Sequence, residues 1–353
     1  MTDFLTPFLT GSRIILEADL KPVIGTRIQP TGFPNLGAAE YELPGKSNAP
    51  ATMLLVESPQ SMANRLESVM WDPATGDLVK ELTGLPYVRA KVDGEFTDSL
   101  REAHRLNSPF LKGIWEPIRE RAEIRAKGKL KSKSDGADDK DREKSDSSGV
   151  DIRKLAKAVF FYDPNSIVHG VFMTNIVGLA RLTRLLSSFV EARNVNIVAS
   201  GGVKNDRVDP SGKRFKGAAE GFGNVPYART EYSAETIRAS FSFDLTLLRS
   251  YGLGADAERL VTSLALWKIQ RLLVDGMRFR TACDLELIDE PIIKRPDAAK
   301  FPSISQLEAS ITASIAACSK AGLFANPATR KSRSSDFTSH RFSCGPISRE
   351  PVG

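Results

Sequence analysis

Two long polar loops contain the residue types that a nucleic-acid-binding surface needs. The first, GTRIQPTGFPNLGAAEY (25–41), combines three glycines and two prolines with Arg27, Gln29 and Thr31. The second, at 201–232, contains six glycines and has a net basic first half. Basic side chains on a flexible backbone can grip phosphates, and aromatic rings can stack on bases. The aromatic residues of the second loop are Phe215, Phe222, Tyr227 and Tyr232. Composition alone equally allows a solvated hairpin without a ligand.

Acidic residues and histidines give weaker signals for chemistry. Asp284 and Glu286 lie two apart in a predicted strand and therefore share one face, which could bind a metal ion or point to solvent. The solvent-facing alternative is favoured because no third ligand lies nearby in the sequence. His104 and His169 have no recognisable serine or cysteine nucleophile as a partner, which favours structural roles. The sequence predicts neither a catalytic residue nor a metal site.

Cofactor motifs and cysteine frameworks are also missing from the sequence. GVKNDRVDPSGK has the wrong spacing for a phosphate-binding loop, and GGVKND does not match a dinucleotide fingerprint. The three cysteines are widely spaced and unaccompanied by zinc-ligand histidines, which argues against disulfide scaffolds and structural zinc. We therefore expect no cofactor.

The charge balance and hydropathy narrow the class of protein. The 353-residue chain has 49 basic and 43 acidic residues, a net charge of +6 that is compatible with an anionic partner without requiring one. It has no basic leader segment and no uninterrupted apolar run of about 18 residues. We expect a cytoplasmic protein without a membrane span.

The elements that must position the two loops alternate along the chain. Ser58 and Pro59 have the types expected at the N-cap and first position of a helix. Strict alternation of apolar and polar residues over 235–248 predicts a half-buried strand. Other strands are predicted at 13–18, 52–57, 158–162, 195–200 and 280–291, and helices at 58–70, 177–194 and 254–276. This order predicts an α+β fold with a ferredoxin-like βαββαβ core and long insertions.

Two segments have compositions that oppose folding. The stretch 127–149 is nearly devoid of apolar residues and mixes basic with acidic side chains, which predicts a disordered insertion. The tail at 326–353 is polar, serine-rich and net basic, which predicts a flexible segment. Residues 1–325, with this insertion included, are predicted to form one domain.

Several motifs, spread in order from about residue 13 to residue 290, resemble a known family. Together they resemble the backbone RAMP subunit of the type I-G (formerly type I-U) CRISPR-associated surveillance complex. The motifs are ILEADLKPVIGTRIQPTGFPNLGAAEY, LLVESPQSMANRLE, EAHRLNSPF, GGVKND, GFGNVPYARTEYSAETI, LRSYGLG, LALWKIQRLL and MRFRTACDL.

The resemblance implies a non-enzymatic, RNA-binding structural subunit of a Cascade complex that serves antiviral defence. Several copies would assemble along the guide part of a CRISPR RNA, which pairs with the target DNA strand. The implied fold is an RRM-like palm with a protruding hairpin thumb, which we place at 201–232. Implied partners are the large subunit, the guide-processing subunit and a recruited nuclease-helicase.

The resemblance and the residue chemistry together predict a set of guide-RNA contacts. Glycines allow close backbone approach, polar side chains reach phosphates or 2′-hydroxyls, and the helix start near Ser58 can hold a phosphate. The predicted RNA-binding residues are Lys21, Arg27, Gln29, Thr31, Gly32, Gln60, Asn64, Arg65, His104, Arg105, Lys204, Asn205, Arg207, Arg229 and Tyr232.

One alternative of a different class stays open, a metal-dependent ribonuclease. Related RAMP proteins of other CRISPR types cut bound RNA with an acidic loop residue, and here Asp206, Asp209 or Asp284 would have to supply it. Acid–base cleavage needs a second positioned group, which the sequence does not identify.

Overall fold

The computed structural model describes most of the chain. The described residues are 3–33, 35–44, 50–92, 94–124, 150–177, 180–213, 220–297, 299–325 and 329–332. The insertion predicted at 127–149 lies outside them, and so does the predicted tail except for 329–332. The division into a domain at 1–325 and a flexible tail stays a prediction.

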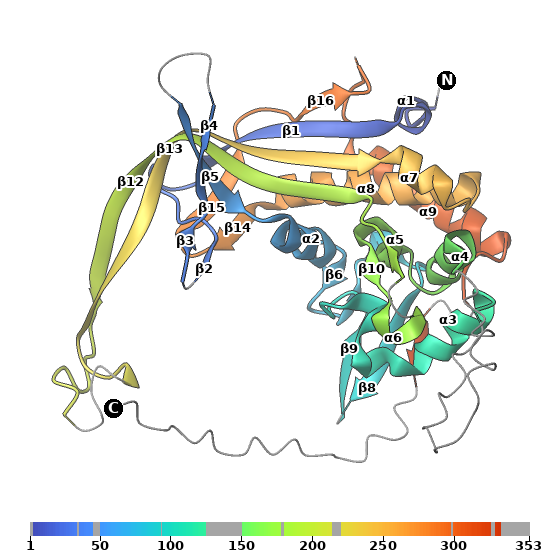
Figure 1. Ribbon diagram of the computed structural model, residues 1–353, viewed down its shortest axis with the longest axis horizontal. Helices are drawn as coiled ribbons and strands as arrows, with labels where there is room; N and C mark the ends of the chain where they lie inside the picture. Colours follow the sequence, from blue (N-terminus) through green and yellow to red (C-terminus); the bar gives the residue numbers. More distant parts are fainter. Residues whose placement is uncertain are drawn as a thin grey trace, which may run out of the picture.

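A large antiparallel sheet organises the fold (Figure 1). Its strands are neighbours in the order β14-β15-β1-β13-β12-β5-β4, and β16 also pairs with β1. These strands are β1 (Arg13–Pro22), β4 (Glu40–Leu43), β5 (Ala51–Glu57), β12 (Leu186–Lys204), β13 (Val225–Asp244), β14 (Met277–Arg280), β15 (Cys283–Leu287) and β16 (Ile292–Arg295). The α+β class predicted from the sequence is confirmed.

Smaller strands form four minor sheets within the described residues. They are β2 (Gly32–Phe33) with β3 (Gly37–Ala38), β6 (Trp71–Asp72) with β7 (Asp77–Leu78), β10 (Val171–Phe172) with β11 (Arg181–Leu182), and β8 (Tyr87–Val92) with β9 (Glu95–Asp98) and β17 (Thr329–Ser332). The pairing of β17 with β8 is parallel, and the others are antiparallel.

Helices α2, α8 and α9 lie on one side of the large sheet, and α8 packs against α9 (Figure 1). The helices are α1 (Thr6–Thr10), α2 (Pro59–Ser68), α3 (Trp115–Arg121), α4 (Ile152–Tyr162), α5 (Pro164–His169), α6 (Thr174–Val177), α7 (Leu245–Ser250), α8 (Ala255–Asp275) and α9 (Ile304–Lys320), with 3-10 turns η1 (Lys80–Leu82), η2 (Arg105–Asn107) and η3 (Pro109–Ile114). No described helix combines the length and the apolar composition needed to cross a bilayer.

The core follows the alternation that the sequence displays. On β13, Ala239, Phe241 and Phe243 are buried while the residues between them are partly exposed, as expected for a strand with one covered face. Phe241 lies opposite Leu16 on β1, which is also buried. The predicted strand at this position is confirmed.

Local signals place the helix that follows β5. The Ser58 hydroxyl accepts a hydrogen bond from the Ser61 amide at 3.3 Å, and Pro59 occupies the first helical turn. A side-chain cap satisfies one of the amides that a helix start leaves unpaired. The predicted N-terminus of α2 is therefore confirmed.

The hairpin formed by β12 and β13 extends far beyond the helical body (Figure 1). Its neighbours end first, since β5 pairs with β12 as far as Arg193 and β1 pairs with β13 as far as Ile237. The two strands continue as a two-stranded ribbon to the pair Lys204–Val225. Much of the predicted loop at 201–232 is therefore strand, since 201–204 belongs to β12 and 225–232 belongs to β13.

Two predicted elements have the wrong type. The helix predicted at 177–194 is wrong, because from Leu186 onward this segment forms the central strand β12, paired on both sides. The strand predicted at 158–162 is wrong, because AVFFY is the last part of α4. A short apolar run does not reveal its period when tertiary packing buries several of its sides. The first polar loop, 25–41, also contains β2, β3 and the start of β4, which pairs with β5.

The alternation on β13 predicts unequal effects of neighbouring substitutions. Phe241→Ala removes a buried ring and is expected to lower the free energy of unfolding by about 3–5 kcal/mol. Ser242→Ala, one residue along the strand, is expected to change it by less than about 0.5 kcal/mol. Urea unfolding of both variants measures the two values, and similar losses would contradict the assigned faces.

Candidate nucleic-acid interface

The two polar loops singled out in the sequence meet at the base of the projecting hairpin. Ile28 and Tyr232 form an isolated antiparallel bridge, in which each backbone amide donates to the other residue's carbonyl at 2.8 Å. This bridge holds the segment 23–31 along the edge of β13. Both loops were predicted from the sequence to bind nucleic acid. The fold brings them together although about two hundred positions separate them in the chain.

Two arginines from these segments surround one buried carboxylate. Arg27 Nη1 lies 3.1 Å from Glu231 Oε2, and Arg229 Nη1 lies 3.6 Å from Glu231 Oε1. Arg229 also donates to Gln29 Oε1 at 3.3 Å. The Arg27 side chain is 55% exposed and that of Arg229 is 30% exposed, whereas that of Glu231 is 7% exposed. The cluster therefore presents a surplus positive charge, as phosphate recognition requires.

Tyr232 does not fit the stacking role predicted for its ring. The residue is 2% exposed, which leaves no free face for a base. Its hydroxyl donates to Glu40 Oε1, and burial together with this hydrogen bond raises the pKa of Tyr232 to about 12. Tyr232 serves to anchor β4 to the hairpin. Tyr227, 48% exposed with the Arg229 guanidinium 5.2 Å from its ring centroid, is the more accessible aromatic residue.

The other residues of the first loop that were predicted to bind RNA form backbone hydrogen bonds or strand pairs within the protein. The amides of Gln29 and Thr31 donate to the carbonyls of Ala282 and Val56 at 2.7 and 2.9 Å. Gly32 pairs with Ala38, and a Cβ at Gly32 would lie 3.1 Å from the Gly37 carbonyl oxygen. The loop is thus anchored to the body along one side.

Lys21 connects this loop to one of the acidic residues weighed as a metal ligand. Its Nζ lies 3.3 Å from Glu286 Oε1, and both side chains are about half exposed. Among the described residues, no group of three or more His, Cys, Asp or Glu residues could hold a metal ion. Glu286 therefore has a charge partner on β1 instead.

At the far end of the hairpin, an aspartate organises the turn. The Asp206 carboxylate accepts hydrogen bonds from the amides of Val208, Asp209 and Gly223. The bond from the Asp209 amide is the main cause of the lowered pKa of Asp206. Lys204 Nζ donates to the Gly221 carbonyl at 2.5 Å. Asn205 and Arg207 are exposed beside it. The turn is therefore a polar, cation-bearing tip.

The predicted residues on α2 divide into exposed and engaged ones. Gln60 and Asn64 are exposed on one side of the helix. Arg65 instead donates to the carbonyls of Arg278 and Phe279, at 3.3 and 2.6 Å, and lies over the Phe279 ring. Arg65 therefore joins α2 to β14, and its charge is partly used within the protein.

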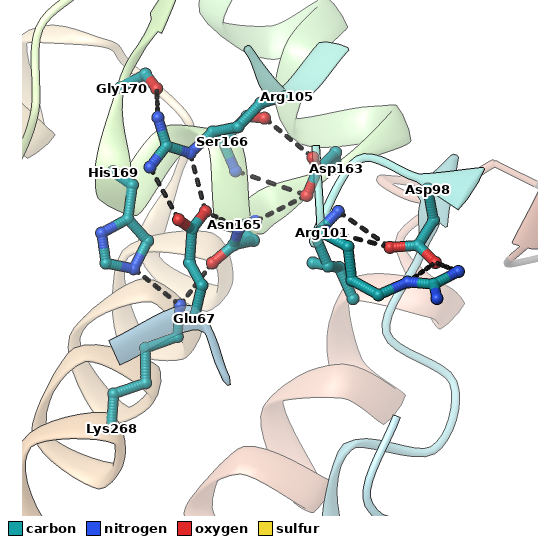
Figure 2. Close-up of polar contacts among 11 residues, drawn as sticks. Glu67, Asp98, Arg101, Arg105, Asp163, Asn165, Ser166, His169, Gly170 and Lys268 are labelled. Atoms are coloured by element: carbon teal, nitrogen blue, oxygen red, sulfur yellow. Dashed lines mark hydrogen bonds and ion pairs between the residues drawn. The ribbon is translucent and has the colours of Figure 1, made fainter. Parts of the chain in front are cut away.

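Of the adjacent pair His104 and Arg105, only His104 is exposed. The Arg105 guanidinium binds both oxygens of Glu67, at 2.7 and 2.8 Å, and the Gly170 carbonyl at 3.1 Å (Figure 2). Arg105 is thus a structural link between α2 and α5, which does not fit the RNA contact predicted for it.

The sequence missed the buried polar cluster to which Arg105 belongs. Glu67 also accepts from Asn165 Nδ2 at 2.8 Å, and Asn165 Oδ1 accepts from Lys268 (Figure 2). Lys268 Nζ lies 2.9 Å from His169 Nε2, and both residues are buried. A lysine inside the apolar stretch LALWKIQRLL was the available signal, because a lone charge there needs partners.

Burial changes the titration of this cluster. Desolvation lowers the pKa of Lys268 to about 7, partly opposed by the nearby Glu67 carboxylate. Desolvation and the Lys268 charge also hold the pKa of His169 well below its ordinary value. The structural role predicted for His169 agrees with this burial.

The shifted lysine predicts how stability depends on pH. From pH 7 to 9 the unfolded chain keeps Lys268 protonated, because its ordinary pKa is 10.5, while the folded chain releases the proton. Wild-type protein is therefore expected to gain about 1 kcal/mol per pH unit relative to Lys268→Met. Urea unfolding at several pH values measures this difference. Lys157→Met, at an exposed position of α4, is the control, and a pH-independent difference for Lys268→Met would contradict the assignment.

Comparisons with known proteins identify the family. The family model described as CRISPR-associated protein GSU0053 matches residues 14–197, just over half of the chain. No curated protein matches. A structure described as "CRISPR RNA-guided surveillance complex, pre-nicking" has a TM-score of 0.36 and 11% identity, over 72% of this chain and 68% of that one. The crystal structure of Thermofilum pendens Csc2 has a TM-score of 0.30 and 9% identity, over 82% and 67%.

Both structural similarities are weak. The family model, in contrast, spans β1, the anchored loop, α2 and the sheet-bound half of β12. The chain belongs to the family of the CRISPR-associated protein GSU0053.

Proposed function

We propose that this protein is the guide-RNA-binding backbone subunit of a Cascade interference complex, of type I-G (formerly I-U), in the RAMP superfamily. Several copies assemble along the guide part of a CRISPR RNA, and the guide pairs with the target DNA strand. The chain itself performs no chemistry. Its other partners are the large subunit, the guide-processing subunit and a recruited nuclease-helicase, all in the cytoplasm.

The observation that carries the proposal is the cationic cluster at the hairpin base. Arg27 and Arg229 meet around Glu231 although they come from distant segments, and both keep exposed donors. Lys204 and Arg207 continue the positive charge toward the hairpin tip. A polyanion lying across the hairpin would contact these residues in turn, which suits backbone recognition without reading of sequence.

The strand order supports the RRM-like palm. Within the large sheet, β15, β1, β13 and β12 are neighbours in that order. Helices lie between β1 and β12 along the chain, and α8 lies between β13 and β15. A βαββαβ core has this order, with the second and third strands here lengthened into the hairpin.

The open face of the sheet supports placing the RNA at the hairpin. Arg238 binds Asp19 at 2.6 Å and Glu17 at 3.0 Å on this face, so its charge is balanced within the protein. RRM domains that bind RNA on the sheet use exposed aromatic residues there. The ion pairs on this face make it poorly suited to stacking.

Binding of single-stranded RNA tests the proposal. We expect salt-sensitive, nearly sequence-independent binding, measured by fluorescence anisotropy of labelled RNA at several salt concentrations. Arg27→Ala and Lys204→Ala are each expected to reduce the magnitude of the salt slope by about 0.7, the value for one lost phosphate contact. Lys157→Ala, which removes an exposed lysine of α4, is the control and is expected to change nothing. Absence of RNA binding by wild-type protein would refute the proposal.

The ribonuclease alternative predicts a different result with magnesium. Asp206 already accepts three backbone amides, so it is suited to holding the turn. We expect bound RNA to stay intact with and without Mg²⁺, as judged on a denaturing gel. Magnesium-dependent cutting that is lost in Asp206→Ala, Asp209→Ala or Asp284→Ala would establish the nuclease instead.

A further inference from the structure

A second cationic surface lies beyond the C-terminal end of α2, where Arg101 covers a tryptophan ring. The Arg101 guanidinium carbon lies 4.5 Å from the ring centroid of Trp71. The Arg89 guanidinium carbon lies 5.5 Å from the same centroid, and Tyr87 meets the ring edge-on. The tryptophan therefore already has two cations against its ring, and Arg101 adds a flat guanidinium group of its own beside it.

Arg101 is held rigidly in this position. Its Nε donates to Asp98 Oδ2 at 2.8 Å (Figure 2). Its Nη2 donates to the Phe96 carbonyl at 2.9 Å. Asp98 is fully buried and also accepts from the amides of Leu100 and Arg101. The Arg101 side chain is nevertheless 43% exposed, and its Nη1 takes part in neither of these contacts. A planar cation is thus fixed in orientation and open to solvent.

A hollow of about 360 Å³ adjoins this plane, within the range of small-ligand pockets. Its lining includes Asn64, Ser68, Trp71, Arg101 and Ala103. Ala103 also lines a second hollow of about 420 Å³, which contains His104 and the exposed Phe172. The two hollows therefore adjoin at Ala103, between α2 and β10.

The polar side of α2 connects the hairpin with this hollow. Gln60, Asn64 and Ser68 follow one another at intervals of four residues and are all exposed, so they form one ridge along the helix. α2 begins directly after β5, the strand that pairs with β12. A strand of RNA leaving the hairpin base could follow this ridge to the hollow, whose lining includes Asn64, Ser68 and Arg101.

The acidic residues of the lining do not oppose an anionic ligand strongly. The Glu102 carboxylate accepts from Thr97 and, at 3.0 Å, from the Ser108 hydroxyl. Glu67 is bound by Arg105. Both carboxylates therefore have hydrogen-bond donors within the protein.

We infer that the exposed plane of Arg101 stacks on one base of the bound single-stranded RNA, with Trp71 as its support. Guanidinium planes are established stacking surfaces for unpaired bases, and the hollow beside Arg101 can receive the base. This inference rests on the proposed function, because it adds a base contact to phosphate contacts made at the hairpin.

The test uses the full chain and single-stranded RNA with 2-aminopurine at successive positions. Stacking quenches 2-aminopurine, so we expect at least one quenched position with wild-type protein. Arg101→Lys keeps the positive charge beside the buried Asp98 carboxylate but removes the planar guanidinium group. It is expected to abolish the quenching and to weaken binding about fivefold or more, the loss of one stacked base. Its salt slope is expected to stay unchanged.

The controls separate this inference from the proposed function. Lys157→Arg, an exchange of the same two residue types at an exposed site on α4, is expected to leave quenching and affinity unchanged. Asp98→Asn combined with Arg101→Ala removes both charges together and is also expected to abolish the quenching of 2-aminopurine. Circular dichroism checks that this double variant is folded. If wild-type protein binds RNA and Arg101→Lys keeps the quenching, the stacking inference alone is overturned. If wild-type protein does not bind RNA, both proposals fall.

Discussion

The pairing of β12 with β13 is the constraint on which the rest of the structure depends. At one end, from Leu186 and Phe243, the two strands form the middle of the large sheet and bury alternate side chains. At the other end, beyond Arg193 and Ile237, they no longer pair with β5 and β1. An isolated two-stranded ribbon is marginally stable in water. Here the ribbon is the continuation of buried strands, so the core sets its direction and register.

This arrangement explains why the cationic cluster forms where it does. The edge of β13 becomes available for the Ile28–Tyr232 bridge just past the last pair with β1. This backbone pairing places Arg27 and Gln29 beside Arg229, although the two arginines repel each other. The buried Glu231 carboxylate reduces the repulsion between the two arginines. The outcome is a cationic surface whose shape depends on strand pairing.

Inside the protein, charged side chains have a structural role. Glu67, Arg105, Asn165 and Lys268 join α2, η2, α5 and α8 through hydrogen bonds that leave little exposed charge. Removing one member of such a group leaves the other charged or polar side chains buried without a partner, which destabilises the fold in a medium of low polarity. The position of α2, and with it the ridge from Gln60 to Ser68, depends on this cluster. The interior cations therefore help to position α2, whereas only the surface cations can contact a ligand.

The amino-acid sequence determined those features that local chemistry dictates. Alternation on β13, the cap at Ser58, the long helix α8 and the polar character of both loops could each be read within about twenty residues, because they depend on period and residue type. The tertiary structure decided the features that depend on distant neighbours. It made 186–194 a strand, since β5 and β13 flank it. It also buried Tyr232 and paired Arg105 with Glu67, while leaving Arg27 and Arg101 accessible. Whether a polar side chain faces solvent or a buried partner depends on pairings across a hundred residues or more, and no local pattern records those pairings.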